Sequence, residues 1–261
     1  MVAAALCAPV PALAAEVKAL YDVTFAGIGI AKGTLGVILR GQSYSAKVQI
    51  STSGLARIIS SEESEATARG SFSGARASPA SYELMSRGEK ITQVNMSLSG
   101  GGVRKLAAHP ELSESPDRIP VTNADKRNVV DPLSAVLMPV KKTGDTDGAA
   151  CNRTLPIFDG WTRYDVKLSY KQTTNVAIEG YSGPAIVCAA RWVPVSGHRE
   201  SRKSTQFMAN NRDIEIWLVP VADAPLLVPY KIGVRTMRGM LTVQATRFEG
   251  AAGGAVRQAV N

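Results

Sequence analysis

Apolar and polar residues alternate with a period of two along most of the chain. The clearest example is the run 163–171, in which Tyr164, Val166, Leu168 and Tyr170 fall on one face. The same alternation occurs in residues 93–98, 213–218 and 241–245. This is the period of strands that bury one face, so the chain is predicted to be rich in β-strands.

Turn sequences that contain glycine separate these runs at short intervals, at residues 31–33, 40–42, 86–89, 179–180 and 238–239. Short turns between strands favour antiparallel meanders. A sheet with so many strands must curl or close to protect its edges. We therefore expect a mainly β fold, a large curved antiparallel sheet in the form of an open barrel or β-spiral, with two or three short helices.

One short helix is predicted after residue 130. Asp131 is a favourable N-cap, Pro132 suits the first helical turn, and Pro139 ends the run. The apolar residues at helical spacing are Leu133, Val136 and Leu137. This stripe should pack into the concave face of the sheet, either as a lid over a ligand or as a fixed part of the core.

A second helix is predicted after Ser53, with Leu55, Ile58 and Ile59 at helical spacing. Two polar segments, 107–126 and 141–150, bracket the Asp131 helix. They show no clean period and are predicted to be surface connections that would let the helix move.

The first fifteen residues carry no charged side chain and end in Ala12–Ala15 after two prolines. This pattern resembles the last part of a secretory signal peptide without its basic region. We expect residues 1–15 to be a signal peptide remnant, 16–250 a single β-rich periplasmic domain, and 251–261 a flexible C-terminal tail. No later stretch approaches the ~18 uncharged apolar residues of a membrane span.

The composition is that of a folded globular protein, with 45% hydrophobic and 20% charged residues among 261. These values exclude collagen-like and wholly disordered chains. The net charge is +8, but the basic residues are dispersed along the chain. Dispersed charge argues against nucleic acid as a partner and favours a loose attraction to anionic surfaces.

The cysteines predict a disulfide. Cys7 should leave with the signal peptide, so that Cys151 and Cys188 remain in an exported chain. A redox pair or a metal site fits less well, because there is no Cys-x-x-Cys spacing and the histidines are His109 and His198. No metal and no cofactor are expected.

The sequence contains few motifs that indicate catalysis. It has neither the Ser-x-x-Lys arrangement nor the Gly-x-Ser-x-Gly elbow of well-known hydrolases. An acid pair for glycoside hydrolysis needs no local spacing and stays open. His198 is interpreted as a loop residue, and Trp192 and Trp217 as core or rim aromatics, with a platform for a sugar as the alternative. We expect that the protein is not an enzyme.

Asp159 and Gly160 should form a tight hairpin turn, with Arg163 and Asp165 on the solvent face of the next strand. Taken together, several short segments of the second half of the chain resemble those of a bacterial family, domain of unknown function 3108, found in exported proteins of proteobacteria. The similarity runs from about Tyr21 to Phe248. The resemblance rests on residues 131–134, 158–164, 181–184, 197–199, 216–220 and 228–230 and on the cysteine pair. It implies a periplasmic, β-rich, disulfide-bonded protein with no established activity.

Two functions follow from this reasoning. The first is a non-enzymatic periplasmic cell-envelope protein that binds a hydrophobic or lipid-like ligand in the concave face of the sheet. The candidate ligand-binding residues are Leu133, Val136, Leu137, Trp192 and Trp217. The alternative is an envelope-integrity or assembly protein that acts through protein or cell-wall contacts and has a fully packed interior.

Overall fold

The computed structural model describes residues 14–54 and 62–250, which form one large antiparallel sheet with a few short helices. The strands are β1 (Ala15–Phe25), β2 (Ile28–Arg40), β3 (Ser43–Thr52), β4 (Glu63–Ser73), β5 (Arg76–Arg87), β6 (Thr92–Ser99), β7 (Gly102–His109), β8 (Met138–Pro139), β9 (Thr154–Phe158), β10 (Arg163–Ile178), β11 (Tyr181–Ser196), β12 (Ile214–Pro220), β13 (Leu226–Thr236) and β14 (Gly239–Glu249). The helices are α2 (Pro132–Ala135), the 3₁₀ helix η1 (Gly148–Cys151) and α3 (Lys203–Asn210).

Two meanders make up the sheet. Its strand order is β7-β6-β5-β4-β3-β2-β1-β14-β13-β12-β11-β10-β9, and β8 pairs separately with β13. The first and last strands, β1 and β14, pair along most of their length and join the two meanders. The predicted mainly β class and the meander topology are confirmed.

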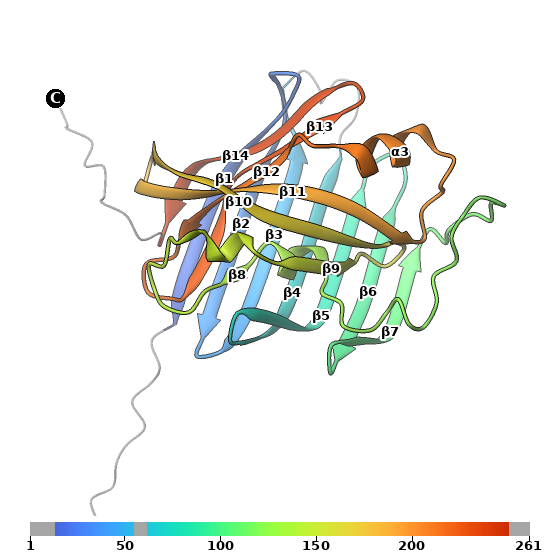
Figure 1. The fold of residues 1–261 in the computed structure, drawn as a ribbon, viewed down its shortest axis with the longest axis horizontal. Helices are drawn as coiled ribbons and strands as arrows, with labels where there is room; N and C mark the ends of the chain where they lie inside the picture. Colours follow the sequence, from blue (N-terminus) through green and yellow to red (C-terminus); the bar gives the residue numbers. More distant parts are fainter. Residues whose placement is uncertain (1–13, 55–61, 251–261) are drawn as a thin grey trace, which may run out of the picture.

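The sheet curls back on itself. Figure 1 shows β9, β10 and β11 crossing in front of strands of the first meander. The turn between β9 and β10 reaches β6, because a Cβ atom at Gly160 would lie 3.0 Å from Val94. Between the two layers lies the inner core, a cluster of buried residues that includes Val37, Ala68, Val94, Leu137, Phe158 and Val228.

The edge strands β7 and β9 do not pair with each other, and residues 126–130 lie between them. On one side, Val103 N donates to Lys126 O and Val129 N to Gly101 O, each at 2.9 Å. On the other side, Phe158 N donates to Val130 O at 3.0 Å. We call residues 126–130 the strap. It satisfies backbone groups of both edges, which would otherwise be free to pair with other chains.

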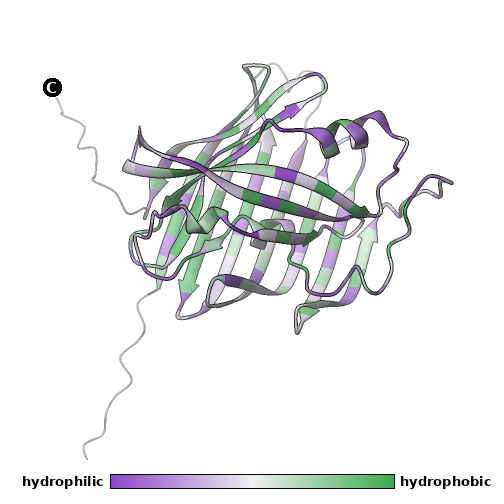
Figure 2. Cartoon of the chain, viewed as in Figure 1, coloured by the Kyte–Doolittle hydropathy of each residue, from purple (hydrophilic) through white to green (hydrophobic). Residues whose placement is uncertain are grey.

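A second cluster, the outer core, lies on the other face of the second meander. It includes Met138, Cys151, Leu168, Cys188, Ile216 and Leu218. Strands β11, β12 and β13 therefore contribute buried side chains to both clusters. Figure 2 shows apolar and polar residues alternating along many strands, as the sequence pattern predicted.

Some predictions fall outside the described residues or need correction. Residues 1–13, most of the second predicted helix (55–61) and the tail 251–261 are outside. Tyr170 was expected on the buried face of its strand, but 46% of its surface is exposed. The helix α3 was not predicted individually, because none of its residues is buried and no apolar stripe marks it.

Candidate functional site

The Asp131 helix forms as predicted, although α2 contains only four residues. The side chain of Asp131 accepts a hydrogen bond of 2.8 Å from Ser134 N, and Pro132 occupies the first turn. Leu133 and Leu137 are 6% and 1% exposed, and Val136 is partly buried against the inner core. The short helix is therefore held by packing rather than by its own hydrogen bonds.

A chain of three buried polar side chains anchors this helix to the first meander. The Ser134 hydroxyl donates to Asp131 Oδ2 at 2.5 Å. Tyr44 Oη lies 2.6 Å from Ser134 Oγ. Because the single hydroxyl hydrogen of Ser134 goes to Asp131, Tyr44 must be the donor in this second bond.

Burial controls the protonation of this network. It raises the pKa of Asp131 to about 6, although the hydrogen bonds from Ser134 lower it again in part. Burial also raises the pKa of the Tyr44 hydroxyl, which therefore stays protonated and remains a donor. The fold thus holds a carboxylate in its interior with neutral hydrogen-bond partners.

Small residues make room for α2 on the concave face. Ala46 pairs with Ala68 across β3 and β4, and both are buried. Gly70 is close-packed in the same region, because a Cβ atom there would lie 2.4 Å from Ser78 O and 2.7 Å from Tyr44 Oη. The chain's own helix and core side chains thus occupy this part of the concave face.

The five residues predicted to bind a ligand do not form one site. Leu133, Val136, Leu137 and Trp217 belong to or pack against the inner core, whereas Trp192 packs against the outer core. The reason is the alternation of side chains along a strand, which directs β11 and β12 residues to either face of the sheet. The sequence pattern could not show this, because both faces of these strands are buried.

Both tryptophans have neighbours that account for their positions. Trp217 Nε1 donates to Glu215 Oε2 at 3.1 Å, and the amine of Lys231 lies 5.2 Å from the ring centroid. Trp192 lies beside Tyr164 and His198, with ring centroids 6.1 Å and 6.4 Å away. His198 lies in the loop after β11, as predicted.

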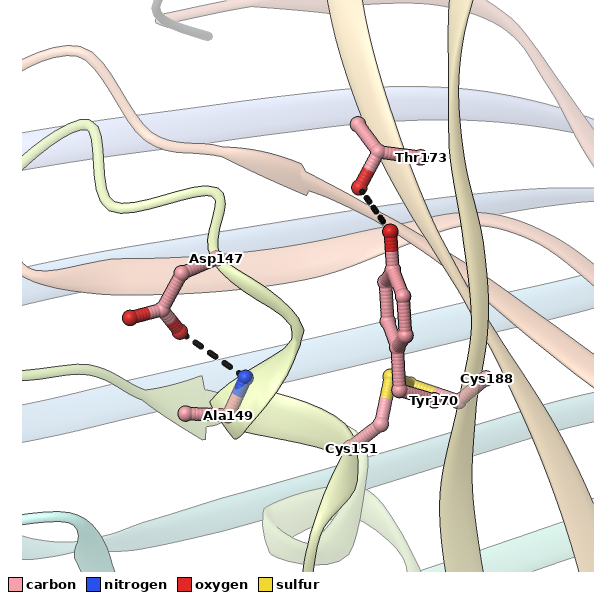
Figure 3. Close-up of a disulfide and its surroundings, with 6 residues drawn as sticks. All are labelled: Asp147, Ala149, Cys151, Tyr170, Thr173 and Cys188. Carbon is pink, nitrogen blue, oxygen red and sulfur yellow. Dashed lines mark hydrogen bonds between the residues drawn. A yellow bond between two sulfur atoms is a disulfide. The ribbon is translucent and has the colours of Figure 1, made fainter.

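The predicted disulfide is present. Cys151 in η1 is bonded to Cys188 in β11, and their Cα atoms are 5.4 Å apart. The carboxylate of Asp147 caps η1 by accepting from Ala149 N at 2.8 Å (Figure 3). The bond ties the segment that follows β8 to the middle of the second meander.

Tyr170 covers the disulfide region from outside, which explains its exposure. A Cβ atom at Gly148 would lie 2.5 Å from the Tyr170 ring, so the ring packs directly on the η1 backbone. Figure 3 shows the ring beside the disulfide, with its hydroxyl 3.1 Å from Thr173 Oγ1. Tyr170 thus packs as a cover on the outer surface.

The hairpin turn at Asp159 is confirmed, but the prediction for the strand after it was wrong. Asp159 Oδ1 accepts from Trp161 N and Thr162 N, at 2.8 Å and 2.7 Å. Arg163 and Asp165 were expected on the solvent face, but they form an ion pair of 2.7 Å with side chains only 13% and 23% exposed.

One part of the polar connection before the strap, around Asp117 and Ile119, is tethered to the loop after β11. Ile119 N donates to His198 O at 3.0 Å, and Gly197 N donates to Ile119 O at 2.8 Å. Asp117 binds Arg199 at 2.8 Å. Hydrogen bonds from Ser115, Ser201 and Arg199 hold the pKa of the Asp117 carboxyl well below its usual range. The segment lies at the surface, as predicted, but these contacts tie residues 117–119 to the loop after β11.

An open groove of about 990 Å³ lies between α3 and the β13–β14 hairpin. Its lining includes four basic side chains and one acidic, which are Lys203, Arg212, Arg235, Arg238 and Asp213. Figure 2 shows α3 as largely hydrophilic. Sequence reasoning missed this site, because the basic residues are spread over two separate segments without a common period.

The comparisons with known proteins place the chain in a family. The family model described as "Protein of unknown function (DUF3108)" matches residues 20–246. The chain belongs to this family. The resemblance inferred from the sequence is confirmed in identity and extent. No curated protein matches the chain.

One solved structure is similar in overall shape. It is the "Beta-barrel-like Protein of Domain of Unknown Function DUF1849" from Brucella abortus, with 8% sequence identity and a TM-score of 0.48. The match covers 90% of this chain and 97% of the other.

The described residues include neither a cluster of metal ligands nor a helix that could span a membrane. Among residues 14–54 and 62–250, no group of three or more His, Cys, Asp or Glu is placed to hold a metal ion. None of the helices described is long and apolar enough to cross a membrane.

Proposed function

We propose that this protein is a non-catalytic component of the bacterial cell envelope that acts through its outer surface while its interior stays packed. The observation that carries the proposal is the filling of the concave face by α2. Leu137, two residues after its last residue, is 1% exposed, and hydrogen bonds of 2.5 Å and 2.6 Å join Asp131, Ser134 and Tyr44. A ligand could enter this region only by displacing the helix.

A periplasmic location is part of the proposal. The disulfide between Cys151 and Cys188 supports it, because such bonds persist in oxidising compartments. The charge-free segment before Ala15 supports it as well, since it resembles the end of a signal peptide. The proposal therefore gives the chain an exported, envelope-associated role.

The surface offers a place for contacts with other envelope components. The groove beside α3 exposes several basic side chains, and the whole chain carries a net charge of +8. Envelope polymers and lipids are commonly anionic. An anionic partner would therefore be attracted to this side of the molecule.

A second candidate function is the binding of a lipid-like ligand beneath α2. One observation favours it, namely that the Asp131 side chain is fully buried at the start of α2. Burial raises the pKa of this carboxyl, so its ionised form costs free energy in this position and would favour release of the helix. Under this function α2 is a lid that opens toward the concave face.

The variant Leu137→Ala distinguishes the two functions when stability and uptake of a hydrophobic dye are measured on the same sample. A packed interior predicts a loss of about 2–5 kcal/mol in the free energy of unfolding and no dye uptake by the folded protein. A small loss of stability with strong dye uptake would contradict our proposal and support the lid. Ile91→Ala serves as a matched control, since the Ile91 side chain is 57% exposed.

A further inference from the structure

Two hairpin tips lie side by side at one end of the molecule, next to α3. Ala26 N, in the β1–β2 turn, donates to Met240 O in β14 at 2.9 Å. A Cβ atom at Gly239 would lie 3.2 Å from the Cβ of Ala26, so the two turns are in contact. Figure 1 shows both hairpins projecting at the same end. We call these two turns the paired tips.

Each of the paired tips exposes a large apolar side chain. Ile28, which follows the first turn, is 64% exposed, and Met237 in the second turn is 56% exposed. Single exposed apolar residues are ordinary on protein surfaces. Here two of the most exposed large hydrophobic residues project from neighbouring turns, at the end of the groove-forming hairpin.

Basic side chains surround the second tip. Arg235 pairs with Asp213 at 3.7 Å, with both side chains largely exposed. In the part of the chain that the structure describes, no acidic side chain lies within 4.0 Å of Lys203, Arg212 or Arg238. All three of these residues are exposed. The groove thus combines cations available for a partner with an apolar tip.

The groove is rigidly built from both of its sides. Asn211, buried at the end of α3, donates to Arg235 O at 2.8 Å and accepts from Asp213 N at 2.9 Å. Thr236 Oγ1 accepts from the backbone of Arg238 and Gly239, both at 3.2 Å, and fixes the hairpin turn. The basic side chains are therefore presented on a fixed frame.

We propose that the paired tips and the groove dock onto the surface of an anionic phospholipid bilayer. Met237 and Ile28 enter the headgroup region, and Lys203, Arg212 and Arg238 pair with lipid phosphates. Exposed apolar side chains next to cations are the combination that binds proteins to membrane surfaces. This inference rests on the proposed function, because it assigns an envelope partner to the same outer surface.

The exposed apolar side chains of the paired tips favour a bilayer, rather than a dissolved anion, as the partner. The basic side chains alone would bind a soluble polyanion as well as a bilayer. A soluble polyanion, however, offers no apolar region in which Met237 and Ile28 could be buried. A bilayer provides both the phosphate layer and the apolar region beneath it. The arrangement of the two kinds of side chain at one end therefore matches a planar, layered partner.

Vesicle flotation of the full chain tests the proposal. Binding is expected to vesicles that contain phosphatidylglycerol, to weaken at high salt, and to be absent from pure phosphatidylcholine. The triple variant Lys203→Gln, Arg212→Gln, Arg238→Gln should bind about a hundredfold more weakly. The double variant Ile28→Ser, Met237→Ser should also bind more weakly at unchanged net charge.

Matched controls remove the same charge and the same kind of apolar side chain elsewhere. The variant Lys105→Gln, Lys141→Gln, Lys142→Gln changes three exposed basic residues outside the groove. Ile91→Ser removes an apolar side chain that is 57% exposed at the β5–β6 turn. Both controls should keep near-normal binding, and circular dichroism should show that every variant is folded.

Three results would overturn the inference. The first is absence of binding to anionic vesicles, and the second is equal loss in the groove and control variants. The third is full competition by inorganic polyphosphate together with no effect of the Ile28 and Met237 changes, which would indicate a soluble polyanion. None of these affects the proposal of a packed interior, which the Leu137→Ala measurement tests separately.

Discussion

The Ser134 hydroxyl donates a hydrogen bond of 2.5 Å to the carboxylate of Asp131, and both residues are 0% exposed. Tyr44 completes the chain from the facing strand. The same Asp131 follows the strap directly, so one short stretch both bridges the edge strands and anchors α2 in the inner core. This arrangement connects the closure of the sheet to the filling of its concave face.

The buried carboxylate makes stability depend on pH. Folding raises the pKa of Asp131 from 3.8 to about 6, so the folded state binds the proton more tightly than the unfolded chain does. The stabilisation by the protonated form is complete below about pH 4 and is lost as pH rises through about 6. A shift of this size corresponds to about 3 kcal/mol.

The variant Asp131→Asn checks this prediction, because asparagine keeps the N-cap but does not titrate. Between pH 4 and pH 7 the free energy of unfolding of the wild type should fall relative to the variant by up to about 3 kcal/mol. Denaturant titrations of both proteins at each pH provide the measurement. A constant difference across this pH range would show that Asp131 keeps an ordinary pKa.

Gly70 should be intolerant of any side chain. In Gly70→Ala the new Cβ atom would meet Ser78 O at 2.4 Å and Tyr44 Oη at 2.7 Å. We expect a loss of about 1–3 kcal/mol in the free energy of unfolding, from backbone shift and from disturbance of the Tyr44 hydroxyl. Gly36→Ala is the matched control, since nothing lies within 4 Å of its Cβ position. Equal stability of the two variants would refute this account of the concave face.

The disulfide should contribute to stability without a further role. Cys151 and Cys188 are 37 positions apart, so removal of the bond should cost about 3–4 kcal/mol by the loop-entropy model. Cys151→Ser, Cys188→Ser and the double variant should lose similar amounts in chemical denaturation. Two titratable thiols in the native exported protein would contradict both the bond and the periplasmic location.

The sequence predicted the parts of the fold that depend on local patterns. Alternation in residues 93–98 and 213–218 predicted β6 and β12, because side chains of a strand face the two sides of the sheet in turn. The cap at Asp131 and the first-turn proline likewise predicted α2, because both act on neighbouring backbone groups. These features need no information from distant residues.

Distant pairings could not be predicted. Tyr44 and Ser134 are 90 positions apart, and nothing in either segment marks the other as its partner. The strap shows no period of its own, because its hydrogen bonds go to β7 and β9. The groove depends on α3, which has no apolar stripe, and on a hairpin that follows it later in the chain.

The central claim is that the interior of this protein is filled by its own side chains and that its partners bind outside. Mass spectrometry of an organic extract from the protein, purified under native conditions from the periplasm, tests this most directly. We predict that the extract contains no lipid in a stoichiometric amount. The claim would be contradicted by about one lipid molecule per chain that stays bound through purification and that anionic vesicles do not remove. Such a lipid would lie beneath α2.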